Sequence, residues 1–565
     1  MDRNLLLAFA LSFLVLTTWS MWQEAQVEIG TGPRGEAEGL ESEGLDDFGD
    51  DFEQAEKALG LPEDEFPSLP PSAEAAPVFE DAPAEPVAEG VGREIVREQP
   101  LYRVVFNTIG GRILRWELEE YRDKGGARVV LLDESIGGGA LTPFTGLGLG
   151  NLATTDWQVA SSGSNEVAFE LERRGVRFRK TYEMDPARYV VRVRLEVENG
   201  SRESIEPRFE LRWPAREREG NDFVEQSMVV LHDAEVETEL LAGLGGGGFF
   251  GGAGEREYPF PGEIDWIGAQ TPYFLSAVFP ESPTQASGRF VVTKPQVSGV
   301  AEAFFTAEKV PPGQSAAREY RLFIGPKETN RLDALGSGAD KAIDLGWAWM
   351  APLTGFFGWA LDVLYSFFGN YGVAIIALTV LVRIVTTPLT MKQMKSMERM
   401  RALQPKVKEL QEKYADDRQK QSEEMMALYR REKVNPLGGC FPLLLQMPVF
   451  IGLFYALRGS VALRQAPFFG WIDDLSAPEE LFVIPGIELP FRVLPVIMAA
   501  SMVVQQKITP MQADPAQAKM MMTIMPVMML VLFYQFPSGL VLYWMVSNVL
   551  AIAHQLYVGR GLKKS

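Results

Sequence analysis

The last third of the chain is dominated by long apolar runs. Five of these runs approach or reach the ~20 residues that a helix needs to cross the hydrocarbon core of a bilayer. They cover residues 371–389, 441–457, 493–508, 520–536 and 539–558. This pattern predicts an α-helical polytopic membrane core of five spans within residues 371–565.

A further apolar run, residues 5–22, lies near the start of the chain and is also long enough to span. Arg3 precedes it, and Trp19 and Trp22 near its end are typical of an interfacial anchor. A cleavable signal peptide is the alternative, but the run lacks a small-x-small cleavage site. We therefore expect residues 1–23 to form an additional N-terminal transmembrane anchor.

Between residues 95 and 335, apolar and polar positions alternate. Val191, Val193 and Leu195 are separated by arginines, and a similar alternation surrounds Trp213. Such a period of two is typical of strands with one buried and one solvated face. The segment predicts a large antiparallel β-sandwich domain.

The segment that follows, residues 340–370, is rich in Trp, Phe and Tyr. This composition predicts an amphipathic helix that lies in the interfacial zone before the first span of the core.

Composition changes the picture for residues 24–94, which are rich in acidic residues, Pro, Ala and Gly. Residues 24–98 carry 22 Asp and Glu against 4 Lys and Arg, a net of -18 out of -21 for the whole chain. Such a segment cannot bury enough apolar surface to offset the entropy lost on ordering. We predict an acidic disordered tether, and the low isoelectric point describes this tether more than the folded parts.

The distribution of basic residues predicts the topology. Residues 391–434 carry 12 Lys and Arg, residues 458–492 carry 3, and the C-terminal tail adds Arg560, Lys563 and Lys564. Short loops rich in Lys and Arg stay in the cytosol. Both termini and the basic loop are therefore expected in the cytosol and the β-domain outside it, as in a multi-pass protein of a bacterial inner membrane with a periplasmic domain.

Few residues are available for metal or acid–base chemistry. The chain has one cysteine, Cys440, and two histidines, His232 and His554. An internal disulfide is excluded, and a structural zinc site needs a cluster of Cys or His that the sequence lacks. No cofactor, metal site or catalytic residue is expected.

The basic loop, residues 391–434, predicts a cytosolic helical hairpin. Pro405 suits the first turn of a helix, and Asp416 and Asp417 mark a break before a second helix. One interpretation is a solvated loop that only carries topology-setting charges. The other is a docking arm, because methionine side chains adapt to varied apolar partners. The candidate docking residues are Met425, Met426, Tyr429 and Arg430.

Arg383 is the most informative single residue, since it is a cation within an apolar stretch. The uncharged residues 363–382 are enough to span alone, which would place Arg383 at the cytosolic flank. Alternatively, residues 369–372 (Gly-Asn-Tyr-Gly) break the helix, the span begins at Tyr371, and Arg383 lies near mid-depth. A cation there costs ~3 kcal/mol or more unless it faces water or a partner. The second interpretation therefore requires a hydrated cavity, which other polar residues of the predicted spans would line: Thr379, Gln446, Gln505, Gln506, Ser547, Asn548 and Gln555.

Three stretches of the C-terminal region resemble the YidC insertase family, Gram-negative type. They are LVRIVTTPLTMKQMKSMERMRALQPKVKEL, EEMMALYRREKVNPLGGCFPLLLQMPVFIGLFYAL and FPSGLVLYWMVSNVL, and the resemblance covers residues 345–562 closely. It implies a five-helix core with a hydrophilic groove open to the cytosol and lipid. The β-domain is similar to the supersandwich of sugar mutarotases, without a catalytic set.

The resemblance also implies roles for particular residues. Arg383 and Thr379 correspond to the groove arginine and threonine, and the family's groove tyrosine falls at Trp544, beside Tyr543. The implied function is a membrane protein insertase and chaperone, not an enzyme. Expected partners are nascent membrane proteins, the Sec translocon, the ribosome and signal recognition particle pathway, and the lipid bilayer, with no direct nucleic-acid contact beyond ribosomal RNA.

Two other functions remain open on the residues alone. A solute transporter would use Arg383 to bind an anion, although we see no internal repeat or paired half-helices. A membrane-anchored carbohydrate-binding protein would leave the five spans and the hairpin unexplained.

Overall fold

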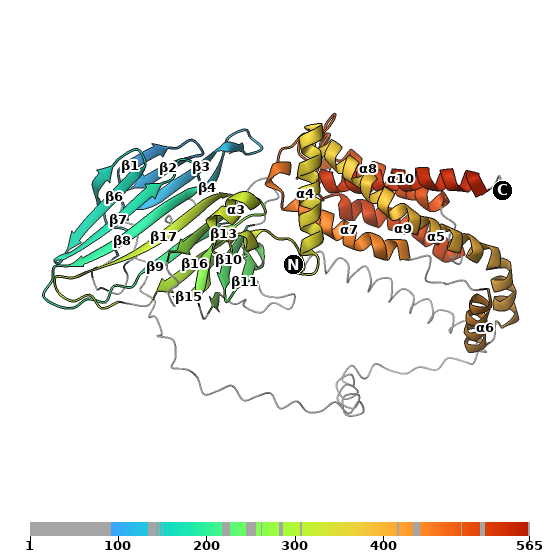
Figure 1. The fold of residues 1–565 in the computed structure, drawn as a ribbon, viewed down its shortest axis with the longest axis horizontal. Coiled ribbons are helices and arrows are strands. Elements are labelled where there is room, and N and C mark those ends of the chain that lie inside the picture. Colours follow the sequence, from blue (N-terminus) through green and yellow to red (C-terminus); the bar gives the residue numbers. More distant parts are fainter. Residues whose placement is uncertain are drawn as a thin grey trace, which may run out of the picture. The chain divides into compact units, whose positions relative to one another are not determined.

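The computed structural model describes residues 92–133, 151–216, 226–244, 256–260, 263–281, 286–305, 308–414, 417–432, 441–486, 489–508 and 515–562, with 144, 147 and 149. The expected anchor (1–23), nearly all of the expected tether (24–94) and Cys440 lie outside these residues. The described part consists of a β-rich region followed by a helical region (Figure 1).

The β-rich region forms three antiparallel sheets within the described residues. The first has the order β1-β2-β3-β4, with bounds Glu94–Glu98, Tyr102–Asn107, Arg112–Arg122 and Arg128–Leu132. The second has the order β11-β10-β13-β14-β17-β8-β7-β6-β5, with bounds, in that order, Glu235–Leu240, Ser227–His232, Ile264–Gln270, Phe274–Pro280, Ser315–Pro326, Val190–Asn199, Val176–Met184, Glu166–Arg173 and Gln158–Ser162. The third has the order β12-β15-β16-β9, with bounds Glu257–Phe260, Ala286–Lys294, Ser298–Phe305 and Glu210–Arg216.

Alternating burial along β7 and β8 shows how these strands pack. On β8, Val191, Val193 and Leu195 are fully buried in one large hydrophobic core. The intervening Arg194 stays on the wet face and pairs with Glu319 of β17 at 2.8 Å. The predicted antiparallel β-sandwich is therefore confirmed.

Several charged side chains of the described residues are buried despite this alternation, among them Glu302, Lys180 and Lys327. Lys180 of β7 is buried in the core, where its Nζ donates to the carbonyl oxygen of Gly110 at 2.6 Å and lies 4.5 Å from the centroid of Trp157. Burial lowers the pKa of Lys180 to about 7 because the charged form is desolvated, and Arg112 lowers it further. Lys327, whose Nζ donates to the carbonyl oxygen of Ala342, has its pKa lowered to about 7 by the same cause.

These two lysines predict a pH dependence of stability. Between about pH 7 and 10.5 the unfolded chain keeps protons that the folded lysines have lost, so the free energy of unfolding rises with pH. Lys180→Met removes one titrating group and lowers this slope by up to ~1.4 kcal/mol per pH unit. The slope is measured from urea unfolding of the full-length protein in detergent, followed by tryptophan fluorescence.

Lys294→Met is the control, because Lys294 is exposed on β15 and its replacement leaves the slope unchanged. A slope equal to wild type in Lys180→Met would contradict the assignment.

The helical region starts after two short elements, α3 (Thr329–Leu335) and a 3₁₀ turn at Ala339–Ala342. Its helices are α4 (Ala351–Phe368), α5 (Tyr371–Lys413), α6 (Arg418–Arg431), α7 (Phe441–Arg458), α8 (Val493–Ile508), α9 (Pro515–Phe533) and α10 (Ser538–Leu562). A short hairpin, β18 (Phe482–Ile484) and β19 (Leu489–Phe491), precedes α8. Among the described residues, Tyr371–Pro388 and Ser538–Tyr557 are long and apolar enough to cross a membrane, while Val493–Ile508 and Met522–Phe533 are shorter apolar helices.

The helix break predicted at residues 369–372 is confirmed. Gly369 has a φ of 63° and ends α4, and the side chain of Asn370 accepts a hydrogen bond from the backbone N–H of Val373 at 3.1 Å. This side-chain cap starts α5 at Tyr371. Arg383 therefore lies inside α5, well after its start.

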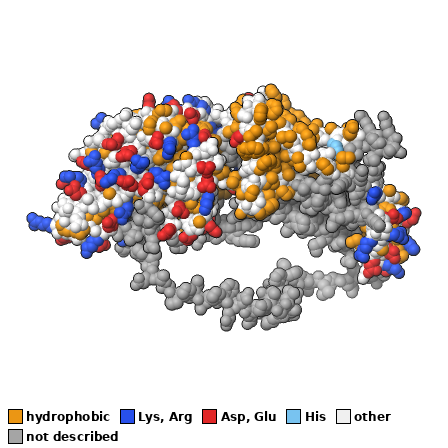
Figure 2. Space-filling model, in the orientation of Figure 1, with side chains coloured by type: hydrophobic (Ala, Val, Ile, Leu, Met, Phe, Trp, Pro, Cys, Tyr) orange, Lys and Arg blue, Asp and Glu red, His pale blue; other side chains and the backbone are white. Residues whose placement is uncertain are grey.

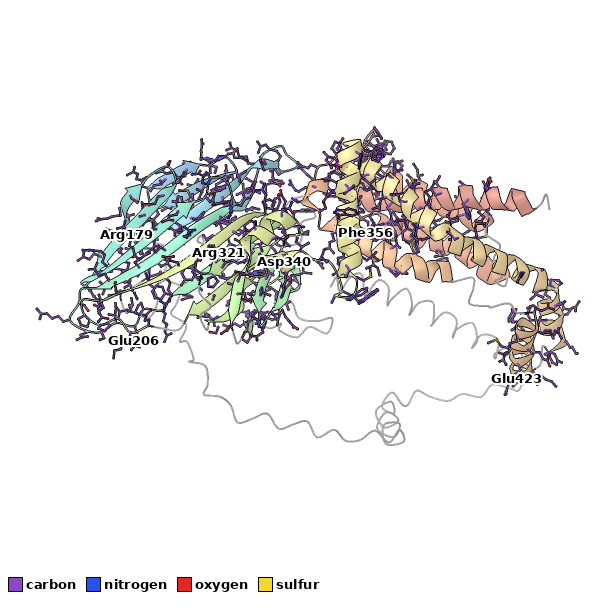
Figure 3. The ribbon with its side chains drawn as sticks, viewed as in Figure 1. Arg179, Glu206, Arg321, Asp340, Phe356 and Glu423 are labelled. Atoms are coloured by element: carbon purple, nitrogen blue, oxygen red, sulfur yellow. The ribbon has the colours of Figure 1, made fainter. Side chains whose placement is uncertain are left out.

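The aromatic helix is shorter than predicted. It begins at Ala351 rather than residue 340, because Gly346 adopts a φ of 78° and Pro352 occupies the first turn. Its outer side carries exposed aromatic side chains, including Phe356 (Figure 3) and Trp359. Figure 2 shows hydrophobic side chains gathered over α4 and the helices beside it, whereas charges of both signs are interspersed over the strands.

One helix boundary in the predicted hairpin is wrong. Pro405 does not start a helix but lies inside α5, which runs on from the apolar segment as one 43-residue helix. The second helix is as predicted, since α6 starts at Arg418 and the Asp417 side chain accepts from the backbone N–H of Lys420. The two arms touch where Leu403 packs against Tyr429 and where Lys406 pairs with Glu432 at 2.8 Å.

Candidate functional site

Arg383 lies on the face of α5 that packs against α10. It is 12 residues after the start of the helix at Tyr371, or about 18 Å along the axis at 1.5 Å per residue. Its neighbours Ile384 and Val385 point outward, with 62% and 78% of their surface exposed. The helix thus presents an apolar outer face and a cationic inner face at the same level.

The guanidinium of Arg383 binds two oxygen atoms of one residue, Ser547 of α10. Nη2 donates to the hydroxyl at 2.6 Å and to the carbonyl oxygen at 2.8 Å, and Nε donates to the hydroxyl at 3.1 Å. Charge-assisted hydrogen bonds of this kind are stronger than neutral ones. Both acceptors are neutral, and no carboxylate of the described residues forms an ion pair with Arg383, so its charge stays uncompensated.

A second polar contact links α10 to α7. Nε2 of Gln446 donates to the phenol oxygen of Tyr543, which is one helical turn before Ser547 and almost completely buried. Tyr543 lies close enough to Arg383 to interact electrostatically with it. Gln446, Tyr543, Ser547 and Arg383 therefore form a continuous polar set, called the α10 polar set below, that connects three helices.

The next residue on α10 makes a third contact. Nδ2 of Asn548 donates to the hydroxyl of Ser501 on α8 at 3.1 Å, in a buried position. The sequence predicted Asn548 as a polar lining residue but missed Ser501. The only sequence signal for Ser501 was its position as a single serine in an apolar run. Such serines are common where membrane helices pack closely, so the signal does not point to a site.

The other predicted residues lie elsewhere. The hydroxyl of Thr379 is buried and donates to the carbonyl oxygen of Ile375 on its own helix at 2.6 Å. The ring of Trp544 packs edge-on against Phe450 at 4.9 Å and beside Phe533 at 5.1 Å. The structure therefore places Tyr543, and not Trp544, in the α10 polar set. Gln505 is half-buried on α8, one turn after Ser501.

The predicted docking residues lie on α6. Met426 and Arg430 are exposed, Met425 and Tyr429 are half-buried, and Tyr429 packs against Leu403 of α5. Within the described residues, no group of three or more His, Cys, Asp or Glu side chains is arranged to hold a metal ion.

Comparison with known proteins identifies the family. Residues 363–565 match the family model described as 60Kd inner membrane protein, and residues 94–357 match the YidC periplasmic domain. Membrane protein insertase YidC of Cupriavidus necator is 36% identical over 86% of this chain and 86% of that protein. The chain belongs to the YidC family of membrane protein insertases. This family comprises inner membrane proteins, and the resemblance seen in the sequence is confirmed.

A second relative shows a similar degree of identity. The YidC insertase of Geotalea daltonii is 35% identical over 85% of this chain and 89% of that protein. A solved active YidC insertase is 21% identical, covers 81% of this chain and 91% of that chain, and has a TM-score of 0.35. The YidC of Thermotoga maritima is 16% identical, covers 81% of this chain and 98% of that chain, and has a TM-score of 0.29.

The geometry predicts an energetic coupling within the helical core. Gln446→Ala and Tyr543→Phe each break the same hydrogen bond, so their effects on the free energy of unfolding are not additive, with a coupling of about 1 kcal/mol. Gln446→Ala combined with Trp544→Phe is the matched control, because the Trp544 ring packs against Phe450 and Phe533. That pair should add to within ~0.5 kcal/mol. Unfolding is followed by titration with sodium dodecyl sulfate in mixed micelles, and additivity in both cycles would refute the contact.

Proposed function

We propose that this protein captures polar segments of nascent membrane proteins at Arg383 and releases their apolar helices into the inner membrane. The observation that carries the proposal is the uncompensated guanidinium, which lies inside the helix bundle and binds only neutral oxygens among the described residues. A substrate carboxylate supplies the missing charge. Such a step needs no covalent chemistry and no cofactor.

The energies support a reversible capture. At ~4 Å and an effective dielectric constant near 20, a carboxylate gains about 4 kcal/mol beside a guanidinium. Carrying an aspartate to the centre of a membrane costs about 3 kcal/mol. The two terms nearly cancel, so an acidic segment can enter the groove and leave it again.

The proposed groove is lined by residues that combine hydrogen-bonding and apolar character. An incoming polar segment can replace the hydrogen bonds that Gln446, Tyr543 and Ser547 now form. The amide and hydroxyl groups of these three side chains are uncharged, so exchanging their partners separates no ion pair. Trp544 adds an apolar wall with Phe450 and Phe533. Thr379, which corresponds to the family's groove threonine, and Gln505, a polar residue predicted to line the cavity, complete the proposed set.

The arrangement in the membrane is part of the proposal. We take α5, α7, α8, α9 and α10 as five spans, residues 1–23 as an anchor, both termini as cytosolic and the β-domain as periplasmic. The excess of Lys and Arg in residues 391–434 supports this orientation. Insertion proceeds alone or beside the Sec translocon. The transporter alternative has no support among the relatives, which are named insertases.

Substitution of Arg383 tests the capture step. Arg383→Ala lowers insertion of a substrate with an acidic translocated segment at least tenfold, equivalent to ~1.4 kcal/mol. It lowers insertion of the same substrate with a neutral segment less than about twofold, because no carboxylate then needs the cation. Arg383→Lys keeps the charge and restores most of the activity. The measurement is protease protection of both substrates after depletion of the wild-type protein.

Lys507→Ala is the control, since Lys507 is an exposed cation at the end of α8 and lies outside the α10 polar set. Equal insertion of the acidic substrate by wild type and Arg383→Ala would rule out electrostatic capture.

We also propose that α6 receives the ribosome or the arriving chain. Met426 and Arg430 of α6 are exposed. The methionine can adapt to an apolar peptide and the arginine can bind a phosphate, and a ribosome with its emerging chain presents both groups.

Arg430→Glu should weaken co-sedimentation with ribosomes about tenfold at low salt, and insertion of purified short substrates in vesicles should stay unchanged. Glu423→Gln is the control, because Glu423 is exposed on the same helix (Figure 3). Unchanged ribosome binding by Arg430→Glu would remove the docking role.

A further inference from the structure

The connection between α7 and α8 contains a small hairpin that none of the roles above uses. Its strands pair Phe482 with Phe491 and Ile484 with Leu489, and Val483 lies opposite Pro490. From residue 481 to 491 the sequence is LFVIPGIELPF, in which Glu488 is the single charged residue. The hairpin is therefore almost entirely apolar.

Its apolar side chains are exposed on both sides of the ribbon. Phe482 and Leu489 on one side and Val483 on the other have 45–49% of their surface exposed. Phe482 and Phe491 stack at 5.1 Å, which holds the two strands together. A free two-stranded ribbon is marginally stable in water and normally carries charges on its open edges. The hairpin has apolar side chains where a water-exposed ribbon would carry charges, so its composition fits contact with an apolar phase.

The base of the hairpin is fixed to the ends of two helices. Arg492, which follows β19 directly, donates to the carbonyl oxygen of Tyr534 after α9, and its guanidinium lies 4.6 Å from that ring. The hydroxyl of Tyr534 donates in turn to the carbonyl oxygen of Pro490. Glu479 accepts from the backbone N–H of Leu494 at the start of α8. The hairpin thus keeps a defined place beside the first turn of α8.

The helices next to the hairpin also carry exposed apolar side chains. Val496 and Ile497 on the first turn of α8 are exposed, as are Val527 and Val531 on the last turns of α9. In an inner membrane protein such outward apolar faces of hydrophobic helices contact lipid. Exposed apolar side chains are therefore found on the hairpin, near the start of α8 and near the end of α9, the two helix ends to which the base of the hairpin is fixed.

The backbone limits how deeply the hairpin can lie. Within the described part of the chain, no further strand pairs with β18 or β19. The N–H and C=O groups on their outer edges are costly in hydrocarbon but not in the hydrated headgroup zone. Strands of three residues are ~10 Å long, close to the ~7 Å thickness of that zone in each leaflet. Tyr534 and Arg492 at the base are residue types that favour the interface.

We propose that the β18–β19 hairpin is a lipid-binding element, which lies in the headgroup and upper acyl zone of the leaflet at the start of α8. Its occupant is phospholipid, contacted by Phe482, Val483 and Leu489. The proposal rests on family membership as an inner membrane protein and does not depend on insertase activity.

The test uses full-length protein with Cys440→Ser and one added cysteine at Val483→Cys, labelled with the polarity-sensitive dye NBD. The protein is reconstituted into phospholipid vesicles with brominated lipids that carry bromine near the headgroup or near the chain end. We expect blue-shifted emission and at least about twofold quenching, stronger with bromine near the headgroup. Leu489→Cys, on the other side of the ribbon, gives the same result.

Two control positions calibrate the signal. Val531→Cys on α9 reports a lipid-facing side chain, and Glu172→Cys on β6 reports a charged side chain in water. A hairpin probe that behaves like the Glu172 probe overturns the proposal. A probe that is blue-shifted but not quenched by either lipid also overturns it, because protein then covers the hairpin. Each variant is first checked for wild-type elution on gel filtration, and insertion activity plays no part in the readout.

Discussion

The bond between the Arg383 guanidinium and Ser547 is the interaction on which the helical region depends. A cation at this level of α5 is costly, and the structure meets the cost with one hydroxyl and one backbone carbonyl oxygen. Hydrogen bonds satisfy the donors but leave the net charge in place. These hydrogen bonds stabilise the guanidinium, and the charge that remains is the feature on which the proposed capture of an anionic segment relies.

The helix α10 organises the surrounding core. Three polar residues within two turns contact three different helices: Tyr543 binds α7, Ser547 binds α5 and Asn548 binds α8. Among apolar helices in lipid there is little hydrophobic drive to associate, so such contacts and close packing decide which helices meet. The α10 polar set is at once a structural junction and the proposed binding surface.

The sequence predicted local features well and non-local ones poorly. The break at Gly369 and Asn370 and the cap at Asp417 follow from local residue preferences, and both are found. The helix start predicted at Pro405 was wrong, because a proline can also lie inside a long helix when packing stabilises it. Here the stabilising contact is that of Leu403 with Tyr429. The pairing of Arg383 with Ser547 joins residues 164 positions apart, and nothing local encodes it. Tyr543 and Trp544 differ by ~100° around one helix, so only the packing shows which of them meets Gln446.

The continuity of α5 has a mechanical consequence. The helix joins Arg383 to the arm that packs against α6 without an intervening loop, over 43 residues. Pro388 follows Arg383 by little more than one turn and cannot donate the hydrogen bond that would stiffen the helix there. The helix therefore lacks one internal hydrogen bond between the cation and the arm, and a bend at that point would change the direction of the arm relative to Arg383.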